Sequence, residues 1–328
     1  MDVRYTAEQR ALRDSVAQVV DRLGPRAVGQ LDDTERTAKL DAAITASGWR
    51  ELRAADSTRA PWASAVEVTI VAEQLARGLA DAPFLGPTLA AELRRVATAD
   101  VETRETVALR PDLSELTAPG DTAIAIDVAE AEAALVLSVG GRLSAVPIAG
   151  PHSQVDLTRP TQSITASSGE VVGRVAAGDV TRCEALALAT TTADLVGIMQ
   201  GALDLTVDYA KERKQYGSPI GSFQAVAHLL ADATVHLEGA RTALLHAAWA
   251  VDALEPSDAL AATASAKAYA SRAAREVCET AIQVHGGIGN TWECLAHVYL
   301  RRALLASDIL GGVGPNLTRV LEHAGIGS

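Results

Sequence analysis

The second half of the chain contains residues 283–291, which read QVHGGIGNT and follow a long alanine-rich segment. Upstream of them, residues 212–217 read ERKQYG and end another segment rich in alanine and leucine. Alanine and leucine favour helix, whereas glycine allows a tight turn or the close approach of a ligand to the backbone. We therefore expect each stretch to be a polar turn at the end of a long helix.

Long helices are expected from about residue 182 onward. They lie near 182–212, 222–252, 257–285 and 293–309, separated by short breaks rich in Gly, Pro and Ser. Long helices with short connections are typical of a helical bundle. The sequence therefore predicts a C-terminal four-helix bundle over residues 182–328.

The N-terminal part is also expected to be helical. Thr6 is a predicted N-cap, and Gln9 stands where it completes a capping box. Further helical segments are expected near 36–47, 65–79 and 88–97. Pro87 and its neighbours interrupt the pattern between the last two. These segments predict an N-terminal helical domain over residues 1–102.

The intervening residues, 103–181, have a different texture. Short apolar runs at 123–126, 134–137 and 144–148 are separated by Gly, Pro, Asp and Ser. Such runs between turn residues are typical of short strands. We therefore expect a mainly α protein with a small central β domain between the two helical domains.

The composition restricts the class of protein. The 328-residue chain is 48% hydrophobic and has a formal net charge of −12. The hydrophobic fraction excludes general disorder. The negative net charge disfavours nucleic acid as a partner. No uncharged apolar run is long enough to predict a membrane span. Cys183, Cys278 and Cys294 show no metal-ligand spacing, so we expect no metal site. A small, odd number of cysteines is typical of a reduced protein, so we expect the protein to be cytoplasmic.

The two glycine-containing stretches belong to longer motifs. These are Arg213-x-x-Tyr216-Gly217 with Phe223-Gln224 and Leu230-Ala231-Asp232, and residues 283–289 with Tyr299 and Arg301-Arg302. In this register the motifs resemble the C-terminal half of flavin-dependent acyl-CoA dehydrogenases, and the resemblance covers most of the chain. It implies FAD as the cofactor, an acyl-CoA substrate such as a fatty acid or steroid side-chain thioester, and an electron-acceptor flavoprotein as a partner.

The resemblance also implies a set of cofactor-binding residues. In the family, FAD lies at a subunit interface, and a neighbouring subunit holds most of its ADP half. The matching residues here are Arg213, Gln224, Gln283 and Gly287, with Gly286 beside them. Guanidinium groups bind pyrophosphate, glutamine amides suit adenine or ribose, and glycine leaves room for a ligand. A helix-end charge, solvated glutamines and an ordinary interhelical turn are the structural alternatives.

The catalytic base of the family has no counterpart where it is usually found. The family's chemistry removes an α-proton with a carboxylate, usually a glutamate. Counting from Gln283, that position is Leu310, followed by Gly311 and Gly312. Some family members carry the base on the first bundle helix, where Asp194 and Glu184 are the candidates, although a buried structural carboxylate is at least as good an explanation of Asp194. The loops that usually flank the flavin ring are not found in residues 103–181.

We therefore expect one subunit of a hetero-oligomer, of the α2β2 type known in this family. This subunit would complete the FAD site of a homologous acyl-CoA dehydrogenase subunit that carries the flavin ring and the base. One alternative is a self-contained homotetrameric enzyme that uses Asp194 or Glu184. Another is a flavin-free structural protein that keeps only the bundle.

Two further expectations concern side chains outside this set. We expect His228 and His285 to be packed or capping histidines rather than metal ligands, because no carboxylate or cysteine stands at ligand spacing. Asp232 and Arg302 are candidates for a structural ion pair in the bundle.

Overall fold

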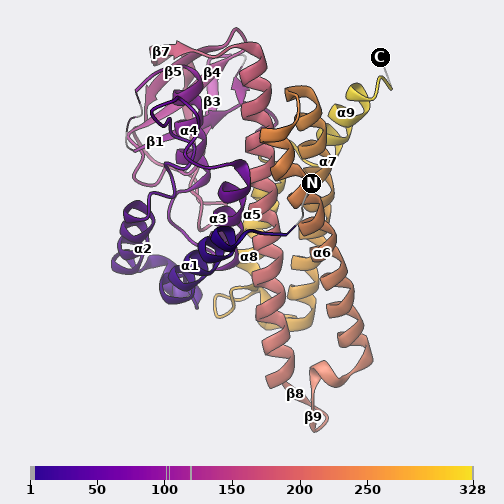
Figure 1. Ribbon diagram of the computed structural model, residues 1–328. Coiled ribbons are helices and arrows are strands. Elements are labelled where there is room, and N and C mark those ends of the chain that lie inside the picture. The colour runs from indigo at the N-terminus through magenta and orange to yellow at the C-terminus, as the bar shows by residue number, and fades with distance from the viewer. Residues whose placement is uncertain (1–3, 101, 103, 119, 327–328) are drawn as a thin grey trace.

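The computed structural model of the protein describes residues 4–100, 102, 104–118 and 120–326. Figure 1 shows the N-terminal helices and the sheet on one side of the long helix α5 (Ala177–Glu212), and the remaining bundle helices on the other. This arrangement confirms the predicted fold class, which is mainly α with a small central β unit and a C-terminal bundle.

The N-terminal part consists of α1 (Ala7–Leu23), η1 (Val28–Asp32), α2 (Thr34–Ala46), α3 (Ala65–Arg77) and α4 (Leu85–Val96). The predicted capping box is confirmed, because Gln9 N donates to Thr6 Oγ1 at 3.2 Å and Thr6 N donates to Gln9 Oε1 at 3.0 Å. α4 begins earlier than expected and includes Pro87. Proline is tolerated there because amides in the first turn of a helix have no intrahelical acceptor.

The central sheet has the strand order β6-β3-β1-β4-β5-β7, with β2 paired to β4. The strands are β1 (Glu105–Leu109), β2 (Thr117–Ala118), β3 (Thr122–Ala125), β4 (Ala133–Ser138), β5 (Arg142–Pro147), β6 (Gln162–Thr165) and β7 (Glu170–Arg174), with η2 (Ala166–Ser168) before the last. The three predicted apolar runs form β3, β4 and β5. β4 runs parallel to β1 and antiparallel to β5, so the sheet is mixed.

The bundle consists of α5, α6 (Gln224–Ala253), α7 (Pro256–His285), α8 (Ala296–Asp308) and α9 (Val313–His323). Its connections contain β8 (Lys214–Gln215), β9 (Ser218–Pro219), η3 (Ile220–Ser222) and η4 (Gly286–Asn290). α5 begins before the expected residue 182, and α9 follows the four expected helices. Gly314 and Pro315 disfavour the prediction of a helix at α9. Both fall in the first turn of this helix, where they are tolerated.

Helix α5 is the central element of the fold. It is long and apolar enough to cross a membrane, the one such helix in the described part of the chain, yet 94% of its most apolar window is buried within the fold. α3 packs closely on it at Gly197 and Gly201, where a Cβ atom would lie 2.1 Å from the carbonyl oxygens of Glu73 and Arg77. Glycine at both positions is therefore a packing requirement.

Two hydrophobic clusters cross the expected domain boundaries. The first joins the N-terminal helices to the bundle, and the second joins α4, β1 and α5 to the turn after α8. The division at 102/103 and 181/182 remains a prediction. Residue 103, on one side of the first boundary, and residue 101 close to it lie outside the described residues.

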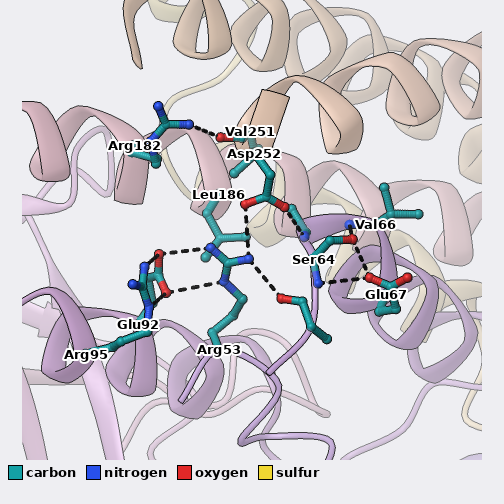
Figure 2. A network of polar contacts seen from close by, with 12 residues as sticks. Arg53, Ser64, Val66, Glu67, Glu92, Arg95, Arg182, Leu186, Val251 and Asp252 are labelled. Atoms are coloured by element: carbon teal, nitrogen blue, oxygen red, sulfur yellow. Dashed lines mark hydrogen bonds and ion pairs between the residues drawn. The ribbon is translucent and has the colours of Figure 1, made fainter. Parts of the chain in front are cut away.

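A buried ion network ties the N-terminal helices to the end of α6 (Figure 2). Arg53 is 1% exposed and donates to both carboxylate oxygens of Glu92, at 3.3 and 3.1 Å, and to Asp252 at 3.2 Å. Asp252 also accepts from the amide of Ala65, the first residue of α3, at 2.6 Å. Arg53 therefore connects the loop after α2 with α4 and α6.

Replacing this arginine tests the importance of the network. Arg53→Met should lower the free energy of unfolding by about 3–5 kcal/mol, because it removes one of the guanidinium groups that neutralise a buried carboxylate. Urea denaturation measures the change. Arg104→Met is the matched control, since Arg104 is 51% exposed in its pairs with Glu130 and Glu132, and its loss should cost about 1 kcal/mol or less. Equal effects of the two substitutions would contradict a structural role for the network.

Candidate functional site

The predicted cofactor-binding residues gather at one end of the bundle. Arg213 is the C-cap of α5, Gln224 begins α6, and Gln283 lies in the last turn of α7 before Gly286 and Gly287. The ends of α5 and α7 meet where the rings of Tyr209 and His285 stack at 4.3 Å. Figure 1 shows the β8–β9 hairpin at this same end, away from the sheet.

These residues face solvent with their binding groups free. In the described residues, the side chains of Arg213, Gln224 and Gln283 are exposed and make no hydrogen bond or ion pair within the chain. Gly286 has a φ of +64°, which favours glycine, and a Cβ atom on Gly286 or Gly287 would meet nothing within 4 Å. Packing within the chain gives no reason for the second glycine. These exposed polar groups are therefore available to a ligand or to a partner chain.

The histidine predictions have different outcomes. The prediction for His285 is confirmed, because it is 6% exposed and its Nδ1 lies 2.8 Å from Ala281 O. Burial lowers the pKa of His285. The prediction for His228 is wrong, since this residue is exposed on α6, where the helix surface faces solvent. Over the described ranges, no group of three His, Cys, Asp or Glu side chains is placed to hold a metal ion.

The residues predicted from the sequence to stand at the position of the family's usual base form a buried turn. Leu310 is 1% exposed and belongs to the hydrophobic cluster that includes α4, β1 and α5. Its amide donates to Leu113 O at 2.6 Å, which ties the turn to the loop after β1. Asn316 Nδ2 donates to the carbonyl oxygens of Leu310, Gly311 and Gly312 at 3.3, 2.7 and 3.0 Å. This turn is therefore tightly held and carries no carboxylate.

Asp194 is held in a buried ion cluster. Arg159 donates to both of its carboxylate oxygens, at 3.1 and 3.2 Å, and Arg302 donates to one of them at 2.6 Å. Burial alone would raise the pKa of Asp194, but the two guanidinium groups hold it below its ordinary value. The predicted pair between Asp232 and Arg302 is wrong, because Arg302 points into the core toward Asp194 while Asp232 is exposed on α6. These surroundings are those of a structural carboxylate.

Glu184 has more suitable surroundings for a base. Burial raises the pKa of Glu184, against the opposing effect of Arg319. Arg319 in turn donates to Leu310 O and Ser114 O, both at 2.8 Å, so Glu184 lies near the turn that replaces the usual base. From the sequence, Asp194 was preferred to Glu184 as a candidate base. The sequence alone cannot show which of the two carboxylates has two arginine partners.

The two candidate regions lie far apart. Glu184 and Glu212 stand 28 positions apart on α5, a distance of about 42 Å along the helix axis at about 1.5 Å per residue. Arg213 is thus at one end of α5, whereas Glu184 and Leu310 are near the other, beside the β unit. One small molecule bound to this chain cannot contact both regions.

A third buried carboxylate, Asp156, was not singled out from the sequence. It is 0% exposed; its Oδ1 accepts from Thr158 N and Oγ1 at 2.8 Å, and its Oδ2 has no partner among the described residues. Burial raises the pKa of Asp156, with Arg302 and Arg159 opposing the shift. Its loop position between Val155 and Leu157 shows no periodicity that would reveal burial.

The ion cluster predicts that Asp194 is needed for folding. Asp194→Asn should lower the free energy of unfolding by about 3–5 kcal/mol, because Arg159 and Arg302 would be left buried with less negative charge. Urea denaturation of the variant measures this loss. Loss of activity with unchanged stability is the contrary result, and it would mark Asp194 as a catalytic base.

Asp156 predicts a stability difference that depends on pH. Because its pKa is raised on folding, the carboxyl group contributes stability below its unfolded pKa and loses that contribution as pH rises through the folded pKa. Asp156→Asn keeps an acceptor for Thr158 and removes the charge. The free energy of unfolding of the variant minus that of the parent should therefore increase from pH 4 to pH 8. Urea denaturation at both pH values measures this difference. A difference that does not change with pH would contradict the prediction.

The comparisons with known proteins agree with this fold. Residues 187–318 match the family model described as the acyl-CoA dehydrogenase C-terminal domain. The chain is 39% identical over 178 residues to acyl-CoA dehydrogenase FadE34 of Mycobacterium tuberculosis, a match that covers 54% of this chain and only 25% of that protein. It is 32% identical over 323 residues to acyl-CoA dehydrogenase IpdE2 of the same organism, with 92% and 93% covered.

A solved structure supports the same assignment at the level of the fold. The ChsE4-ChsE5 complex from Mycobacterium tuberculosis matches with a TM-score of 0.81 and 24% identity, covering 99% of each chain. The match to IpdE2 extends over nearly the whole of both chains at an identity that shows common descent. The chain belongs to the acyl-CoA dehydrogenase family.

Proposed function

We propose that this chain is the subunit of a hetero-oligomeric acyl-CoA dehydrogenase that completes the FAD site of a homologous partner. The reaction is the α,β-desaturation of an acyl-CoA thioester. The observation that carries the proposal is that Arg213, Gln224 and Gln283 lie free and exposed at one end of α5, while the other end carries Leu310 in place of a base. The chain offers the means to bind a cofactor without the group that removes the proton.

Each exposed residue has a defined role in this proposal. Bound FAD supplies the hydride acceptor. Arg213 would bind its pyrophosphate, because a guanidinium group without an internal partner gives up no interaction when it binds phosphate. Gln224 and Gln283 would donate to and accept from the adenine or ribose, and Gly286 and Gly287 would allow the cofactor to approach the turn. The partner would hold the flavin ring, the base and the thioester.

Several details of the assembly belong to the proposal alone. The ChsE4-ChsE5 structure is a complex of two named chains, and its similarity in fold supports a two-chain arrangement here. The substrate class is an acyl-CoA thioester of a fatty acid or a steroid side chain, and the electron acceptor is a flavoprotein. The assembly would work in the cytoplasm, where the three buried free cysteines remain reduced.

A self-contained enzyme is the second candidate, and the position of Glu184 favours it over the Asp194 version. Burial raises the pKa of Glu184, as a general base requires, whereas Asp194 has both oxygens bound by arginines. In this case the purified chain alone would turn over acyl-CoA, and Glu184→Gln would abolish turnover while the fold remained intact.

A flavin-free structural protein is less well supported. A bundle without a cofactor would not require three unpartnered polar side chains around an open glycine turn. A colourless complex that assembles stably without flavin would nevertheless establish this alternative.

The deciding experiment measures flavin content by absorbance. The chain is purified alone and then co-expressed with each neighbouring reading frame in turn. We expect little FAD on the lone chain and about one FAD per pair of chains in the complex. Stoichiometric FAD and full turnover on the lone chain would overturn the shared-site proposal.

One substitution tests the role assigned to Arg213. Arg213→Gln should weaken FAD binding by the complex about ten- to a hundredfold, because a hydrogen bond to a charged group contributes about 1.5–3 kcal/mol. Arg142→Gln is the matched control, since Arg142 is also exposed but begins β5, far from the hairpin end of the bundle. FAD titration of the apo-complexes measures both. Equal affinities for the two variants would remove Arg213 from the site.

A further inference from the structure

Lys267 is a fully buried lysine under the turn that occupies the base position. It lies in the middle of α7 and is 0% exposed. Its ammonium group donates to Ser271 Oγ at 3.2 Å, to Ser307 O at 2.8 Å and to Gly311 O at 3.1 Å. Two of these acceptors belong to the end of α8 and to the turn that follows it, so Lys267 binds the turn from below.

The acceptors of this ammonium group are all uncharged. The charged groups that face Lys267 are Asp308 of α8 and Asp194 of α5, which favour the proton, and Arg319 of α9, which disfavours it. Neither carboxylate forms a hydrogen bond with the ammonium group. An ammonium group that is buried without a paired carboxylate is expensive, because neutral acceptors replace only part of its hydration. The proton is therefore held more weakly here than in water.

The turn bound by Lys267 is a junction between parts of the fold. Leu310 and Gly311 are consecutive residues with left-handed backbones, at φ values of 62° and 82°. The amide of Leu310 donates to Leu113 O in the loop after β1, and Arg319 donates to both Leu310 O and Ser114 O. Opening of the turn would break these contacts with the β unit and would expose Lys267 to water.

We propose that Lys267 is a proton-linked latch: opening of residues 309–312 takes up a proton at Lys267, so the turn closes more firmly on the β unit as pH rises. This inference concerns the lone chain and does not depend on the shared FAD site. The pH dependence of the turn comes from Lys267 on α7, because Leu310 in the turn has no group that titrates.

The direction of the effect follows from the two protonation equilibria. Burial lowers the pKa of Lys267 in the closed turn from 10.5 to about 7. In the open turn the side chain regains water and its ordinary pKa. Between these values the open form binds one more proton than the closed form, so the opening constant falls about tenfold per pH unit. Below about pH 7 both forms are protonated, and the opening constant is flat.

Hydrogen exchange of the full-length chain tests the latch. The amides of Leu310 and Gly311 report on the turn, because they donate to Leu113 O and Asp308 O when it is closed. Their protection factors, corrected for the intrinsic pH dependence of exchange, should rise about tenfold per pH unit from pH 7 to pH 9. Lys267→Met should abolish the rise, whereas Lys211→Met, at an exposed lysine of α5, should leave it unchanged.

Two outcomes would overturn the proposal. One is a protection factor that stays constant with pH in the parent, or that keeps its slope in Lys267→Met. The other is exchange that follows global unfolding, shown by a urea dependence as steep as that of the α5 core, because local opening exposes little surface. If Lys267→Met does not fold, an NMR titration of the Lys267 Cε resonance in the parent decides: a pKa near 7 supports the latch, and one near 10 excludes it.

Discussion

The buried contact between Asp194 and its two arginines is the interaction on which the architecture depends. Arg159 comes from the loop before β6, Arg302 from α8 and Asp194 from α5, so one carboxylate joins the β unit to two bundle helices. The same arginines reach further: Arg159 pairs with Asp127, whose other oxygen accepts from the amide of Gly86 in α4, and Arg302 donates to Ala80 O after α3. A charge buried this deeply is tolerated only when several partners surround it, and here those partners come from every part of the chain.

This cluster also determines what the nearby carboxylates are able to do. Both oxygens of Asp194 are engaged by guanidinium groups, so the carboxylate stays ionised and fixed in place. General bases need a free lone pair and a pKa near the working pH. Glu184 lies ten residues earlier on the same helix, and its pKa is raised by burial and lowered by one arginine, Arg319. The difference between a structural and a reactive carboxylate on α5 therefore lies in the arginine partners, not in the residue type.

The sequence predicted the large features of the fold because they rest on local patterns. Apolar periodicity and capping residues placed α1 and the first four bundle helices, and short apolar runs placed β3, β4 and β5. Prediction failed where a residue has two possible local roles. Pro87 looked like a helix break, yet it stands in the first turn of α4. Likewise, the partners of Arg302, the burial of Lys267 and the free oxygen of Asp156 depend on contacts between distant segments, which no spacing in the sequence encodes. The sequence also predicted that Arg213, Gln224 and Gln283 stand at helix ends, because each lies within a few residues of a glycine. Their role in binding a cofactor stays a proposal.

The length of α5 connects these findings to function. A helix that spans about 42 Å between Glu184 and Glu212 keeps the two ends of the molecule independent, so one end can change its residues while the other keeps its own. At the end beside the β unit, Leu310 fills the core and Lys267, Asn316 and Arg319 bind the turn around it. At the hairpin end, Arg213, Gln224 and Gln283 have no internal partner among the residues that the structure describes. The two ends cannot contact the same cofactor molecule within one copy of the chain, so a cofactor bound at the hairpin end would need a second subunit, either another copy of this chain or a homologous chain. In the shared-site proposal, a homologous chain would bring its own base and flavin pocket to the hairpin end, while the turn beside the β unit would keep its packing contacts and the proton-linked opening inferred for it.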